Sequence, residues 1–171
     1  IIFAVSQNVK LINISMGACS FKDFDMLEEA CTHAYNNNLL IIASAGKHIP
    51  LILPWGCSNV IKVMLGSKSD NSIRIREDIY KSSVIEVNRK LFIASSLRTR
   101  DKFSTGNSAC TAFITNKFIK IMENNLINND YRPETTIETT IKEFYKQHAD
   151  DYEYKWTRLL KPIKPVEAEL S

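Results

Sequence analysis

Ser108 is the residue of this chain whose surroundings best suit chemistry at a hydroxyl group. It lies in the stretch Gly-Asn-Ser-Ala-Cys-Thr-Ala at residues 106–112. The apolar residues that follow have the spacing of one buried helical face: Phe113, Ile114, Phe118, Ile121 and Met122. A serine at a helix start lies near backbone N–H groups that lack intrahelical acceptors and can hold a developing oxyanion. An ordinary N-cap serine fits the same pattern, so the sequence predicts a helix over residues 108–125 and leaves both roles open.

Buried strands and helices alternate upstream of this serine. The apolar segments 10–15, 39–45 and 59–65 each have the length of a buried strand. Between the first two, an amphipathic helix is predicted over residues 23–37, with these residues on its apolar face: Phe24, Leu27, Cys31 and Ala34. Such alternation is typical of an α/β domain in which helices flank a parallel sheet. We therefore expect the three strands to lie adjacent and parallel.

The pattern is less regular after residue 66. Residues 72–76 alternate like an edge strand, and residues 83–87 with 91–94 suggest a hairpin. A further helix is expected over residues 134–147. A Lys-Pro-Ile-Lys-Pro run then follows, and proline is unfavourable in both helix and strand. We accordingly divide the chain into a domain at residues 1–149 and a Pro-containing tail at residues 150–171.

In their order and spacing, these segments resemble the second half of a subtilisin-like serine protease (subtilase) domain. Leu-Ile-Asn-Ile-Ser-Met-Gly at residues 11–17 is similar to the family's Val-Ile-Asn-Met-Ser-Leu-Gly strand. Ile-Ile-Ala-Ser-Ala-Gly-Lys at residues 41–47 is similar to its Val-Val-Ala-Ala-Ala-Gly-Asn. Gly-Asn-Ser-Ala-Cys-Thr-Ala-Phe at residues 106–113 is matched to Gly-Thr-Ser-Met-Ala-Ser-Pro-His. The resemblance covers roughly residues 1–147 and implies that Ser108 stands at the nucleophile position.

The same resemblance assigns two further parts of the site. Lys47 stands where most subtilases carry an asparagine that donates to the oxyanion. The strand beside which the family docks its substrates ends in Ser15, Met16 and Gly17. Asn107 replaces the usual threonine before the serine, and Ala112 and Phe113 replace the usual Pro-His, which together suggest relaxed selection on the geometry around the nucleophile.

The rest of a catalytic triad is missing from this sequence. The resemblance implies a partial subtilisin-like domain whose first half, with the catalytic aspartate and histidine, is absent. No Asp-Thr/Ser-Gly strand end and no His-Gly-Thr block occurs here. His33, His48 and His148 are expected to be solvated or packed rather than catalytic. Lys47 could act as base only in a dry pocket that lowered its pKa, whereas its loop has the character of a solvated segment. A serine without a base is a poor nucleophile.

Composition limits the classes of partner. The net charge of +3 on 171 residues is small and scattered, which argues against nucleic acid. No apolar run has the length of a membrane span, and the first residues lack the flanks of a signal peptide. The four cysteines share no metal-ligand spacing and are expected to be buried free thiols, which favours the cytoplasm: Cys19, Cys31, Cys57 and Cys110. No cofactor and no metal is expected.

Three functions stay open. The first is a serine protease homologue (a pseudoprotease) that does not cleave on its own and keeps the fold to bind a peptide or protein. The second is the C-terminal part of an active serine endopeptidase, completed by a separate segment or chain. The third is an unrelated α/β domain that binds peptides or proteins. In the first two, we expect the edge of the strand at residues 11–15 to be covered by a second copy of the chain, by the Pro-containing tail or by a complementing polypeptide.

Overall fold

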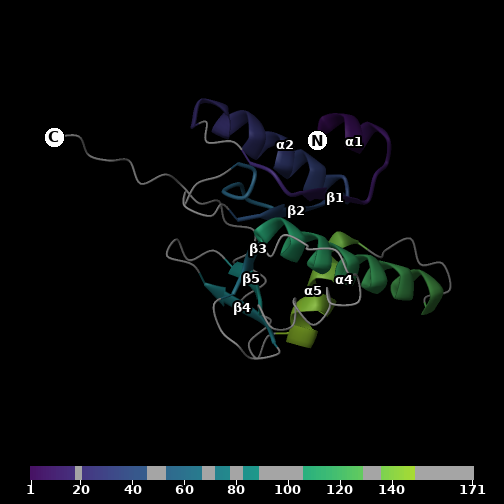
Figure 1. Cartoon of the computed structure of the whole chain (residues 1–171). Helices are drawn as coiled ribbons and strands as arrows, with labels where there is room; N and C mark the ends of the chain where they lie inside the picture. Colours follow the sequence, from purple (N-terminus) through teal and green to yellow (C-terminus); the bar gives the residue numbers. More distant parts are fainter. Residues whose placement is uncertain are drawn as a thin grey trace, which may run out of the picture.

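A five-stranded sheet forms the centre of the chain (Figure 1). The computed structural model describes residues 1–17, 21–45, 53–66, 72–77, 83–88, 106–128 and 136–148. The strands lie in the order β1-β2-β3-β5-β4. The first four of these run parallel: β1 (Leu11–Ile14), β2 (Leu40–Ser44), β3 (Val60–Leu65) and β5 (Ser83–Val87). The fifth, β4 (Ile73–Glu77), is antiparallel to β5 and forms the edge opposite β1.

The three strands predicted upstream of Ser108 are confirmed as adjacent and parallel, and residues 72–76 contribute the predicted edge strand. The predicted hairpin of residues 83–87 with 91–94 is wrong. β5 pairs with β3 on one side and with β4 on the other, so both of its edges are occupied. Its antiparallel partner is therefore the strand that precedes it, and residues 91–94 lie outside the described ranges.

Helices cover both faces of the sheet (Figure 1). One face carries α1 (Ile2–Ser6) and α2 (Phe24–Asn36), which follows a short 3₁₀ turn, η1 (Phe21–Asp23). The other carries α4 (Asn107–Asn128) and α5 (Ile137–His148). α5 begins three residues later than the sequence predicts. The hydroxyl of Thr136 accepts the N–H of Thr139 at 3.4 Å, so Thr136 caps the helix.

Because helices cover both faces of the sheet at β2, the residues of this strand separate into two cores. Leu40 and Ile42 belong to the core under α4 and α5, where the rings of Phe118 and Phe144 stack with centroids 4.4 Å apart. Ile41 and Ala43 belong to the core under α1 and α2. All five residues of β2 are buried, which explains why its first four residues are all apolar instead of alternating.

The apolar helix faces predicted from the sequence point into these cores. On α2, Cys31 and Ala34 are buried, while Phe24 and Leu27 are partly buried against them. Cys31, Cys57 and Cys110 are buried free thiols, as predicted. Cys19 and the expected tail at residues 150–171 lie outside the described ranges, and the domain boundary stays a prediction.

Among the described helices, none has both the length and the apolar character needed to span a membrane. A search of the described residues also finds no group of three or more His, Cys, Asp or Glu side chains that could hold a metal ion.

Candidate functional site

Ser108 lies in the first turn of α4, which contacts β1, β2 and β3. The carbonyl of Gly106 accepts the N–H groups of Ala109 and Cys110, at 3.1 and 3.2 Å. Gly106 is therefore the N-cap, and Ser108 is the second residue inside the helix. The alternative that Ser108 is an ordinary N-cap serine is wrong, because the helix begins before it; its hydroxyl instead donates a hydrogen bond to a distant segment.

The acceptor of that hydrogen bond is the main-chain carbonyl of Ser15, 2.9 Å from the Ser108 hydroxyl oxygen. Ser15 directly follows β1, and its own hydroxyl lies 3.0 Å from the side-chain oxygen of Asn13 and 3.4 Å from the carbonyl oxygen of Ser108. The structure thus brings Ser108 together with the first residue of the expected substrate strand. Beyond it, Met16 is 78% exposed and Gly17 is exposed, so this end of the strand lies open at the surface.

Asn107 fastens the start of α4 to two further strands. Its side-chain nitrogen donates to the carbonyl of Ala45 at 2.7 Å, and its side-chain oxygen accepts the N–H of Leu65 at 2.8 Å. Ala45 follows the last residue of β2, and Leu65 is the last residue of β3. These two bonds give Asn107 a structural role at the start of α4. A side-chain amide can donate to a carbonyl and accept from an N–H at the same time, whereas the threonine side chain is shorter. The amide residue next to Gly106 was the one feature of the sequence that could have indicated this role.

Neither described histidine lies beside Ser108. His33 is on α2, across the sheet from α4. His148 ends α5, where its ring packs on Phe144 with centroids 4.7 Å apart. Phe144 in turn stacks on Phe118, about 15 Å along α4 from Ser108 at 1.5 Å per residue. His48 and Lys47 lie outside the described residues, so the oxyanion role of Lys47 stays a prediction.

Comparison of the chain with models of protein families found no match, and neither did comparison with curated proteins. Evidence on function therefore comes from the residues and their arrangement. Within the described residues, that arrangement places a serine hydroxyl and the positive end of a long helix at the carboxyl ends of three parallel strands. In open α/β sheets this end of the strands is where ligands bind.

Proposed function

We propose that this chain is a subtilisin-like serine peptidase homologue that does not hydrolyse peptides on its own. The observation that carries the proposal is the hydrogen bond from the Ser108 hydroxyl to the Ser15 carbonyl. A carbonyl oxygen holds the hydroxyl in place, but it cannot remove the proton at neutral pH, as a catalytic base must. The order of the parallel strands and the place of Ser108 at their ends support the family resemblance.

The residue at the oxyanion position supports this proposal. Where the family supplies an asparagine donor, this sequence has Lys47. Loss of one such donor costs about 3–4 kcal/mol of transition-state stabilisation. The site would then keep its capacity to bind without the capacity to cleave.

We propose that the site still binds an extended peptide or protein segment. The segment would lie as an additional strand beside Ser15, Met16 and Gly17, held by main-chain hydrogen bonds. The exposed Met16 side chain offers it apolar contact. The Ser15 carbonyl already accepts the Ser108 hydroxyl, so it has one remaining lone pair for a peptide N–H.

A peptide-hydrolysis assay tests the inactive assignment. The purified chain and its Ser108→Ala variant are incubated with a library of fluorogenic peptides, with Ser6→Ala as the control for an exposed serine outside the site. We expect all three to give the same background rate. A rate that Ser108→Ala abolishes and Ser6→Ala retains would overturn the proposal.

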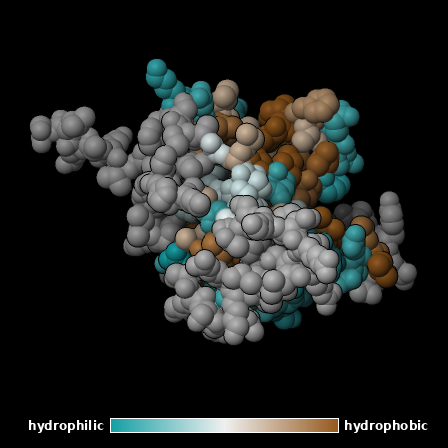
Figure 2. Space-filling view, viewed as in Figure 1, coloured by the Kyte–Doolittle hydropathy of each residue, from teal (hydrophilic) through white to brown (hydrophobic). Residues whose placement is uncertain are grey.

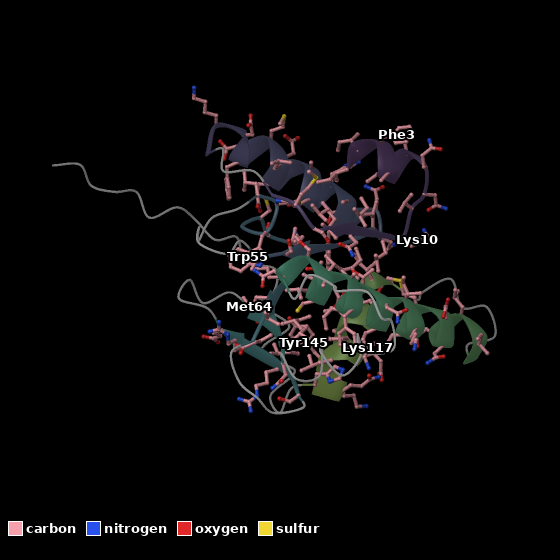
Figure 3. All side chains as sticks on the ribbon, viewed as in Figure 1. Phe3, Lys10, Trp55, Met64, Lys117 and Tyr145 are labelled. Atoms are coloured by element: carbon pink, nitrogen blue, oxygen red, sulfur yellow. The ribbon has the colours of Figure 1, made fainter. Side chains whose placement is uncertain are left out.

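An active enzyme completed by a second polypeptide is the alternative that a specific observation favours. β1 is an edge strand, and beside it α1 exposes Ile2 at 55% and Phe3 at 76%. Figure 2 shows apolar surface gathered over α1, and Figure 3 shows Phe3 at its outer side. A partial domain completed by further strands would pair this edge and cover this surface.

This alternative has its own test. A second polypeptide with an Asp-Thr-Gly and a His-Gly-Thr block is added to the chain before the peptide assay. Activity that needs both polypeptides and is lost in Ser108→Ala would establish the split enzyme. Absence of activity despite a stable complex would leave the binding role.

A further inference from the structure

A second set of contacts, on the opposite face of the sheet from α4, joins α2 to the segment before β3. The N–H and the hydroxyl of Ser58 both donate to the carboxylate of Glu28, the N–H at 2.8 Å. The side-chain amide of Asn59 donates to the hydroxyl of Thr32 at 3.2 Å. Glu28 and Thr32 are four residues apart, so they lie on one face of α2. These bonds hold that face against residues 57–59.

Two cysteines meet inside this contact. Cys31 lies on the same face of α2, and Cys57 directly precedes Ser58. Both side chains are fully buried in the same core cluster between α2 and the sheet, and Cys31 is the neighbour that acts most strongly on the pKa of the Cys57 thiol. No part of the proposed peptide site uses this pair.

The environment keeps the Cys57 thiol protonated. The hydrogen bond with Cys31 raises the pKa of the Cys57 thiol, and burial and the carboxylate of Glu28 raise it further. The charge of the buried Lys62 acts in the opposite direction. Both sulfurs are also fully buried, so oxidation needs a transient opening of α2 from residues 57–59.

We propose that Cys31 and Cys57 are a reversible modification site, at which a disulfide oxidant such as glutathione disulfide cross-links α2 to the segment before β3. In the first step, the thiolate of one cysteine attacks a sulfur of glutathione disulfide and releases one glutathione thiolate. The second cysteine then attacks the mixed disulfide, which forms the Cys31–Cys57 bond and releases a second glutathione. Two electrons pass from the cysteine sulfurs to the oxidant, and the two thiol protons end on the two glutathione molecules.

The cross-link would stabilise the native fold. It closes a loop across α2 and β2 and restricts the unfolded chain, while in the folded chain the two side chains already lie in one buried cluster. For a domain of this size we expect the melting temperature to rise by roughly 5–10 °C on oxidation. Reduction should reverse the rise.

Disulfide mapping tests the proposal directly. The full chain is equilibrated in glutathione buffers of increasing oxidised fraction, with enough urea to permit local opening. Remaining thiols are then blocked with N-ethylmaleimide, and peptides are mapped without reduction. We expect a Cys31–Cys57 peptide pair, together with a melting temperature that rises and returns when dithiothreitol is added.

Two variants provide the comparison. Cys110→Ala removes a buried thiol from the other core and should keep both the link and the thermal shift. Cys31→Ala should lose both. If a variant fails to fold, the map of the unmodified chain decides. Glutathione bound singly to each cysteine, links that involve Cys19 or Cys110 instead, or a Cys31–Cys57 link that lowers the melting temperature would each overturn the proposal.

Discussion

The hydroxyl of Ser108 donates a 2.9 Å hydrogen bond to the main-chain carbonyl of Ser15, and this bond joins the first turn of α4 to the end of β1. The two residues are 93 positions apart in the sequence. The bond directs the only proton of the hydroxyl at an acceptor that cannot remove it. In this arrangement the serine fixes the relative position of a helix and a strand.

Removal of the Ser108 hydroxyl should cost little stability. Ser108→Ala loses a hydrogen bond at an exposed position, where water replaces the partner of the Ser15 carbonyl. We expect the free energy of unfolding to fall by about 0.5–1 kcal/mol. Urea denaturation measures the change, with Ser6→Ala as the exposed-serine control. A loss above about 3 kcal/mol would mean that Ser108 is buried by contacts that the structure does not show.

Asn107→Ala should be the more damaging change at the start of α4. It removes the acceptor of the Leu65 N–H and the donor to the Ala45 carbonyl together. We expect a loss of about 1–3 kcal/mol in the free energy of unfolding. Asn116→Ala, at an exposed position of the same helix, should be neutral or slightly stabilising because alanine favours helix. Equal effects of the two substitutions in urea denaturation would show that the bridge between β2 and β3 contributes nothing.

Stability should increase as the pH rises through the ordinary pKa of histidine. Burial lowers the pKa of His148 below 6.5, and the charge of Lys117 lowers it further. The unfolded chain therefore binds this proton more readily than the folded chain, so protonation favours unfolding. Melting temperatures between about pH 5 and pH 8 measure the effect. His148→Gln should flatten the part of the curve below pH 6.5, and an unchanged slope would contradict this assignment.

The exposed side chains of α1 should drive association through the open β1 edge. We expect sedimentation velocity of the purified chain to show oligomers, and Phe3→Glu to shift them toward monomer. Leu126→Glu changes a side chain of similar exposure (70%, against 76% for Phe3) at the far end of α4 and should leave the distribution unchanged. A monodisperse monomer before any substitution would show that this surface needs no partner.

The sequence predicted the elements well because their signal is local. Continuous apolar segments marked the strands, and apolar residues spaced three and four apart marked α2, α4 and α5. The hairpin prediction failed because the pairing of β5 with β3 joins distant segments, which a local pattern cannot show. The alternation of residues 72–76 was enough to recognise β4 as a strand, but it did not indicate that β4 pairs with β5.

The site was predicted less completely than the fold. A helix start beside glycine identified Ser108, and similarity to a known strand pointed to Ser15. The hydrogen bond between them depends on where α4 lies relative to β1, which periodicity does not determine. The bridge made by Asn107 was missed for the same reason, since its partners follow β2 and end β3. Lys47 lies outside the described residues, so its role is still a prediction.

Covalent labelling of Ser108 tests the central claim most directly. The purified chain is treated with a fluorophosphonate, which reacts with a serine that a base has activated, and the intact mass and the peptide carrying Ser108 are measured. Our account predicts that the mass stays unchanged and that this peptide carries no adduct, because the Ser108 proton is held by the Ser15 carbonyl. An adduct on Ser108 in the chain alone, absent from Ser108→Ala and retained in Ser6→Ala, would contradict it.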